Sequence, residues 1–192
     1  MTSQPLVPAR HRFTVAEYHE MVRAGILAED ARVELIDGEL LDMPPVGDRH
    51  ISSVDRVADV LFGVFRDVAI VRVQSPVQVG LTNEPMPDVS LLRRRSDYYR
   101  TGSLAISDIY LVVEVGDTTS DADRRDKVPM YSRQGVKELW LVNLNRDTLT
   151  VYRDPTPDGY GLVMTLRRGD SVALLAFPDR LIAVTDLLGD SA

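Results

Sequence analysis

The chain has 192 residues, of which 44% are hydrophobic and 27% charged, and its formal net charge is −7. This length and composition are typical of one globular domain with a substantial core. The absence of cysteine excludes disulfides and thiolate zinc sites, and the three histidines show no metal-ligand spacing. Any metal ion would therefore be held by oxygen, which favours magnesium, manganese or calcium.

No segment has the features of a secretory signal or a membrane span. Met1 to Arg12 contains no apolar core, and no apolar run approaches the roughly 20 residues that span a bilayer. We therefore expect a cytoplasmic protein that does not bind membranes. The acidic excess argues mildly against broad non-specific binding to nucleic acid, because phosphate affinity comes from clustered Lys and Arg. The two dense basic clusters, Arg93–Arg95 and Arg124–Lys127, are each interpreted as solvated loop charges.

The N-terminal third predicts two helices separated by a hairpin. Thr14 and Glu17 have the spacing of a capping box, which begins a helix of about three turns. The segment Val33–Met43 predicts two short strands around Asp37-Gly38, a dipeptide typical of hairpins. From His50 to Arg66, apolar residues recur at helical spacing, and this is the clearest helix in the chain.

The remaining segments are dominated by strand patterns. The predicted strands are Ala69–Val73, Val77–Val79, Asp88–Leu92, Ile109–Val115, Glu138–Asn143 and Thr148–Tyr152. The fourth is apolar on both faces and is therefore expected to be central. A polar loop, Gly116–Asp121, leads into a third helix that ends at Gly135. This order of elements predicts an α/β domain with a mixed β-sheet flanked by helices.

Two acidic residues lie at these apolar strands. Asp88 follows Pro87, and Glu114 lies within the run Leu111–Val115. A buried carboxylate is costly unless a cation or strong hydrogen-bond donors lie opposite it. Together with Lys127, the two carboxylates suggest a divalent metal site. Each has an ordinary alternative: Asp88 as a turn residue, Glu114 as the partner of an arginine, and Lys127 as a solvated helix residue.

Beyond these three residues, an ordered set of motifs runs from about Phe13 to Tyr152. The motifs are Glu34-Leu35-Ile36-Asp37-Gly38-Glu39, His50 after Pro44-Pro45, Gln74-x-Pro76-Val77, Pro87-Asp88, Glu114-Val115 with Asp117-Thr118-Thr119, Asp123-Arg124, Lys127-x-x-x-Tyr131, and Gly135-Val136-x-Glu138-x-Trp140-Leu141-Val142. This set resembles the Uma-two family of "putative restriction endonucleases" in the PD-(D/E)XK nuclease superfamily. No single motif is diagnostic, whereas the ordered set is fairly specific.

The resemblance implies a single domain with a restriction-endonuclease-like core over residues 13–152 and a C-terminal extension over residues 153–192. It also implies an endonuclease that hydrolyses phosphodiester bonds in DNA with Mg²⁺ or Mn²⁺. In such a site Asp88 and Glu114 would bind the metal and Lys127 would position the attacking water.

The chain departs from the superfamily pattern at the lysine. Simple members carry it two residues after the second acid, where this chain has Gly116. The resemblance therefore places the lysine on the following helix, at Lys127. Pro129 requires that this helix start close to Lys127 or be kinked there, because an interior proline removes a helical hydrogen bond.

Four further residues are supporting candidates, each with a structural alternative. Glu39 is either a third carboxylate or an exposed hairpin end, and Gln74 either points toward the cleft or caps an edge. His50 is either a helix-start residue or a group near the metal. Tyr131 lies one turn beyond Lys127 on the same helical face, where it either supports the site or packs.

The sequence leaves the activity itself open. A catalytically inactive interaction module with the same fold is the main alternative, favoured modestly by the negative charge and the displaced lysine. A nuclease acting on RNA or on a small phosphodiester is a third interpretation. A two-fold homodimer would suit cleavage of both DNA strands, although no interface is legible in the sequence.

Overall fold

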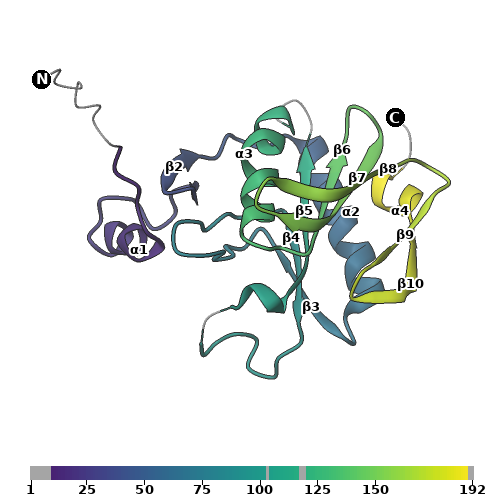
Figure 1. The fold of residues 1–192 in the computed structure, drawn as a ribbon, viewed down its shortest axis with the longest axis horizontal. Helices are drawn as coiled ribbons and strands as arrows, with labels where there is room; N and C mark the ends of the chain where they lie inside the picture. The colour runs from purple at the N-terminus through teal and green to yellow at the C-terminus, as the bar shows by residue number, and fades with distance from the viewer. Residues whose placement is uncertain (1–9, 103, 117–119, 190–192) are drawn as a thin grey trace, which may run out of the picture.

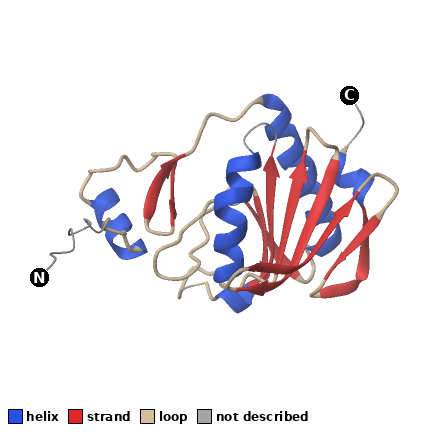
Figure 2. Ribbon diagram, turned by 45° about the horizontal axis from the view of Figure 1, so that its top comes forward, coloured by secondary structure: helices blue, strands red, loops and turns tan. Residues whose placement is uncertain are grey.

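The computed structural model describes residues 10–102, 104–116 and 120–189, with only the backbone described at 120–125. Its centre is a six-stranded mixed sheet, seen with its flanking helices in Figure 2. In spatial order the strands are β3 (Ala69–Val73), β4 (Val89–Arg93), β5 (Ile109–Gly116), β6 (Glu138–Asn143), β7 (Thr148–Thr156) and β8 (Gly159–Leu166). Only β5 and β6 pair in parallel. The predicted mixed α/β sheet is therefore confirmed.

One long helix covers each face of this sheet (Figures 1 and 2). Helix α2 (Asp48–Phe65) packs its apolar stripe on one face, in a core that contains Trp140. Helix α3 (Ser120–Arg133) covers the other face, where Met130 and Tyr131 are fully buried. Because β5 lies between the two helices, both of its faces are apolar, as expected for a central strand.

The N-terminal segment lies to one side of the main sheet (Figure 1). Its elements are α1 (Val15–Arg23), β1 (Val33–Ile36) and β2 (Glu39–Asp42). The predicted capping box is present, because the Thr14 hydroxyl accepts from the Glu17 amide and the Glu17 carboxylate accepts from the Thr14 amide. The predicted hairpin turn is also present. Gly38 has φ of +76°, and a Cβ there would collide with Arg12, so glycine suits this position.

The C-terminal segment adds a second hairpin and a short helix. These are β9 (Ser171–Leu174), β10 (Phe177–Ala183) and α4 (Val184–Leu188). Elsewhere in the chain, a 3-10 turn, η1 (Ile106–Asp108), precedes β5. The buried Glu138 carboxylate joins the hairpin to the sheet. It accepts from the Leu175 amide at 2.7 Å and from the Arg153 guanidinium at 2.6 Å. The apolar side chains of the hairpin extend the core on the α2 face.

Two predictions need correction. Val77–Val79 is not a strand but part of a loop, in which Val77 and Val79 donate backbone hydrogen bonds to Pro85 and Asn83. Strand β3 ends just before Gln74, whose φ of +43° turns the chain out of extended geometry. The predicted polar loop Gly116–Asp121 is shorter than expected, because the third helix already begins at Ser120. Of the two alternatives at Pro129, a helix start close to Lys127 is therefore excluded. Residues 117–119 of the predicted polar loop lie outside the described residues.

Within the described part of the chain, no helix has both the length and the hydropathy needed to cross a membrane.

Candidate active site

Asp88 and Glu114 come together because β4 and β5 run antiparallel. Val89 pairs with Val113, so one step along this register places Asp88 opposite Glu114. The Asp88 carboxylate accepts a hydrogen bond of 2.7 Å from the amide of Val115, which fixes it against the end of β5. Both carboxylates are buried, at 8% and 5% exposure. The sheet thus brings two acidic side chains from separate strands to one place.

Lys127 reaches the same place from α3. Its ammonium Nζ lies 2.9 Å from Oε1 of Glu34 and 3.5 Å from Oε2 of Glu114. The lysine is itself buried at 8% exposure, so its charge is held by these carboxylates rather than by bulk water. The helix therefore supplies a cation opposite β5.

Glu34 is the site residue that sequence reasoning did not select. It lies in the buried strand β1, and its Oε1 also accepts a hydrogen bond of 2.7 Å from the amide of Met86. The available signal was the same one that pointed to Glu114, an acidic residue inside an apolar run, Val33–Ile36. The sequence-based candidate is instead Glu39, which directly follows the hairpin turn at Asp37-Gly38.

The structure does not bring Glu39 to the cleft. Its carboxylate lies 2.8 Å from Arg12 and 3.7 Å from Arg10, and the side chain is 44% exposed. Register puts Glu34 and Glu39 on the same face of the hairpin, because Glu39 pairs with Ile36, two residues after Glu34. They differ in position along the strands, since Glu39 directly follows the turn and lies beside Arg12. Glu39 stabilises the N-terminal segment through a surface ion pair, and Glu34 occupies the position near the metal-site candidates.

His50 and Gln74 both line the cleft. Nε2 of His50, in the first turn of α2, lies 3.0 Å from Oδ1 of Asp88. The backbone amide of Gln74 donates to the Asp88 carbonyl at 2.9 Å, so this residue holds the start of β4 in place. Its left-handed backbone conformation is uncommon outside glycine, and such strain often accompanies functional sites.

Tyr131 lies directly beneath Glu114. Its hydroxyl donates a hydrogen bond of 2.9 Å to Oε1 of Glu114, and the ring is fully buried. Burial, reinforced by the negative charges of Glu114 and Glu34, holds the pKa of Tyr131 well above its usual value. The hydroxyl therefore keeps its proton and acts as a fixed donor to the Glu114 carboxylate.

Replacement of Tyr131 by phenylalanine should lower the free energy of unfolding by about 1.5–3 kcal/mol, because a hydrogen bond to a charged group is lost in a buried site. Urea denaturation measures this. Tyr160→Phe is a matched control, because its hydroxyl donates to the neutral carbonyl of Val136 at 2.8 Å. Its loss should cost about 0.5–1.5 kcal/mol. Equal losses in the two variants would contradict a charged acceptor.

A cleft of about 660 Å³ lies between the β1–β2 hairpin and the sheet, and it is lined by Glu34, His50, Gln74, Asp88, Glu114 and Lys127 but not by the buried Tyr131. Its acidic lining residues are Glu34, Asp42, Asp88, Glu114 and Asp126, and its cationic lining residues are Arg32 and Lys127. The cleft thus carries three more carboxylates than cationic side chains. Such an excess attracts cations and repels free phosphate groups.

The donor set of the cleft fits a hard divalent cation. Its acidic groups offer only oxygen, and Mg²⁺ is commonly held by one or two carboxylates together with waters and substrate phosphates. Asp88 and Glu114 are the two carboxylates that would hold it. Among the described residues, no group of three or more Asp, Glu or His side chains is arranged to hold an ion, so this chain would supply only part of the coordination.

Comparisons with known proteins bear on the family and the fold. A family model described as Uma2, "Putative restriction endonuclease", matches residues 15–185. The fold is similar to a crystal structure described as a "putative nuclease belonging to DUF820" from Anabaena variabilis, with a TM-score of 0.68 and 16% sequence identity. The match covers 92% of this chain and 97% of that one. No curated protein matches the sequence.

Proposed function

The chain belongs to the Uma2 family of "putative restriction endonucleases", and from this premise we propose that it is a metal-dependent endonuclease that hydrolyses phosphodiester bonds in DNA. The chemistry lies within residues 13–152, since every residue that lines the cleft falls in that range. Residues 153–192 would be the C-terminal extension, and within its described part β8 forms an edge of the main sheet.

The observation that carries the proposal is the meeting of Glu114 and Lys127. A buried carboxylate from β5 and a buried ammonium from α3 lie 3.5 Å apart at the wall of an open cleft. A purely structural ion pair of this kind is often no more stabilising than apolar residues of the same volume. Its position beside Asp88 and His50, in a cleft with excess negative charge, supports a role in binding and catalysis.

Each side chain has a stated role in this proposal. Asp88 and Glu114 hold Mg²⁺ or Mn²⁺, and Lys127 positions the attacking water. When bound, such a cation lowers the pKa of water and neutralises charge on the scissile phosphate. Glu34 positions Lys127 by accepting from its ammonium, and His50 orients Asp88.

Cleavage of supercoiled plasmid DNA tests the proposal. Wild-type protein should convert it to open-circular or linear forms with Mg²⁺ or Mn²⁺ and not with EDTA. Glu114→Ala should abolish the reaction because a metal ligand is lost. Glu39→Ala is the control, since Glu39 lies outside the cleft; it should cleave at the wild-type rate. Cleavage that persists in EDTA would overturn metal dependence.

Manganese should raise the melting temperature of the wild-type protein. A ligand that binds only the native state stabilises it by RT ln(1 + [L]/Kd), about 2.7 kcal/mol at a hundredfold excess over Kd. Thermal unfolding monitored by circular dichroism measures the shift without DNA. The shift should disappear in Glu114→Ala and persist in Glu39→Ala. A shift of equal size in both variants would place the ion elsewhere.

One observation favours a second candidate, an inactive interaction module with the same fold. Both oxygens of Asp88 already have protein partners, His50 and the Val115 amide. Glu114 is likewise engaged by Tyr131 and Lys127. In an inactive module this network would serve stability alone. The two candidates differ in the plasmid assay, where the module leaves DNA intact with every metal.

A further inference from the structure

Resting on the proposed function, we infer that a second polar cavity binds the phosphodiester backbone of the DNA substrate beside the cleft. This cavity, of about 380 Å³, lies on strands β6, β7 and β8. Its polar lining residues, named here the backbone tract, are Asn143, Arg146, Thr148, Thr150, Thr165 and Arg167. Side chains with hydroxyl, amide or guanidinium groups commonly donate hydrogen bonds to DNA phosphates.

Strand register places four of these side chains, Asn143, Thr148, Thr150 and Thr165, on one face, while Arg146 lies in the β6–β7 turn and Arg167 directly follows β8. Asn143 pairs with Thr148, and Thr150 pairs with both Leu141 and Thr165 across neighbouring strands. Directly opposed residues in a ladder project from the same side of the sheet. Leu141 packs with Met130 and Tyr131 of α3, so the backbone tract lies on the α3 face. Glu114, which is bonded to Tyr131, projects from this same face.

The register also gives the distance from the carboxylates. Glu114 pairs with Leu141, Leu141 with Thr150 and Thr150 with Thr165, so these four residues form one row across the sheet. Three strand spacings of about 4.8 Å separate Glu114 from Thr165, or about 14 Å. A duplex carries one phosphate per strand every 3.4 Å along its axis, so the backbone tract lies about four base pairs from the cleft.

The turn after β6 connects the two sites. Arg49, next to His50 at the start of α2, donates to Oδ1 of Asn145 at 2.9 Å and to the Leu144 carbonyl. This contact ties the cleft side of α2 to the segment that carries Arg146. A DNA strand leaving the cleft over this turn would therefore meet the backbone tract first.

The cationic side chains of the backbone tract are available for a ligand. Arg146 and Arg167 are exposed, and within the described residues neither guanidinium makes an ion pair or a hydrogen bond. The arginine cluster at 93–95 is different. Arg93 pairs with Asp108 and Arg95 with Asp97, and the Arg94 guanidinium donates to the carbonyls of Arg66 and Ala69, so all three side chains already have partners. Side chains of the other basic cluster, at 124–125, lie outside the described residues.

Charge balance explains why a nuclease with this cleft needs such a tract. The net charge is −7 and the cleft has an acidic excess, so neither attracts a polyanion. DNA affinity must then come from cationic side chains placed outside the cleft, where released counterions supply the free energy. The backbone tract combines two uncompensated arginines with hydroxyls on the face that carries Glu114.

Binding of a short DNA duplex in EDTA, followed by fluorescence anisotropy over a range of salt concentrations, tests the inference. Arg146→Ala combined with Arg167→Ala should make the slope of log K against log salt shallower by about 1.8, at 0.9 per phosphate contact. At about 0.1 M salt the affinity should fall by about 60-fold if these contacts act only through counterion release. Both residues are exposed, so the variant should keep the wild-type melting temperature.

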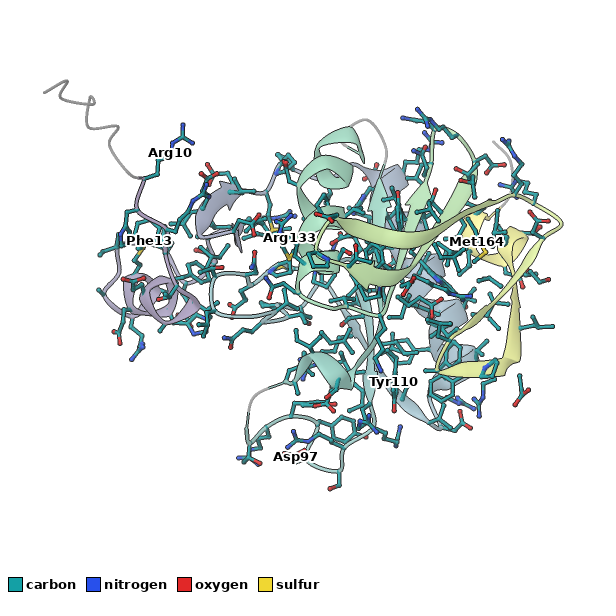
Figure 3. All side chains as sticks on the ribbon, in the orientation of Figure 1. Arg10, Phe13, Asp97, Tyr110, Arg133 and Met164 are labelled. Atoms are coloured by element: carbon teal, nitrogen blue, oxygen red, sulfur yellow. The ribbon has the colours of Figure 1, made fainter. Side chains whose placement is uncertain are left out.

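The matched control is Arg66→Ala combined with Arg100→Ala. It removes the same charge from two exposed arginines that also make no side-chain bond among the described residues. Arg66 follows the end of α2. Arg100 lies in the loop that contains Asp97, which Figure 3 shows at the lower edge of the molecule. This control should leave the slope unchanged.

The outcomes separate the inference from the proposed function. Plasmid cleavage with an unchanged salt slope in the tract variant would overturn the backbone tract and leave the endonuclease proposal standing. Tract-dependent binding without cleavage under any metal would support the tract and overturn the endonuclease. Equal losses in the tract variant and the control, or no binding by wild type, would overturn the tract.

Discussion

Replacement of Lys127 by alanine should lower the rate of DNA cleavage by about 10²–10⁴-fold, the range typical of a lost proton-transfer or positioning group. Metal binding should persist. Removal of the ammonium leaves Glu34 and Glu114 without their shared cation, and a divalent ion can neutralise the two carboxylates instead. Plasmid cleavage rates and the Mn²⁺-induced rise in melting temperature together measure the two effects.

Lys137 provides the control, because it is the other lysine of the sequence and is exposed. Lys137→Ala should cleave at the wild-type rate. A Lys127→Ala variant as active as wild type would show that the lysine assignment is wrong. Loss of the Mn²⁺ shift along with cleavage would mean that Lys127 supports the fold of the site rather than the chemistry. If wild type cleaves neither DNA nor RNA, the interaction module is the better interpretation.

Replacement of Glu138 by alanine should lower the free energy of unfolding by about 3 kcal/mol, because it removes a fully buried carboxylate and leaves the partly buried Arg153 without its partner. Glu138 is fully buried, and its Oε1 accepts from Arg153 at 2.6 Å and from the Trp140 indole at 2.9 Å. Its Oε2 accepts from the Leu175 amide, so the same carboxylate ties the β9–β10 hairpin to the sheet. Urea denaturation monitored by circular dichroism measures the loss.

Glu20→Ala is the exposed counterpart. Glu20 forms a surface ion pair with Arg23, with both side chains about two-thirds exposed, and pairs of this kind contribute little. The expected change is within about 0.5 kcal/mol. Glu138→Gln keeps one acceptor oxygen for Trp140 and Arg153 but places an NH2 group against the Leu175 amide. Its destabilisation should still be smaller than that of Glu138→Ala, which removes both oxygens. The reverse order would mean that a donor facing the Leu175 amide costs more than the lost acceptors.

The local elements of this protein follow closely from the sequence. The apolar spacing of α2, the two-sided apolar run of β5 and the capping box at Thr14 each predict the element that the structure contains. Their signals are local, because helical period, strand period and cap geometry depend on residues a few positions apart. The loop at Val77–Val79 is the exception, since its β-branched residues match a strand while the turn at Gln74 directs the chain away from the sheet.

The meeting of side chains depended on the tertiary structure. Carboxylates at apolar strands predict Asp88 and Glu114, and the resemblance adds Lys127, but Glu34 reaches Lys127 across 93 positions of sequence. That contact requires the β1–β2 hairpin to lie against the end of β5, which no local pattern encodes. The backbone tract likewise exists only because register aligns Thr148, Thr150 and Thr165 on one face. Backbone propensity acts over neighbouring residues, whereas strand pairing and helix placement decide which distant side chains share a site.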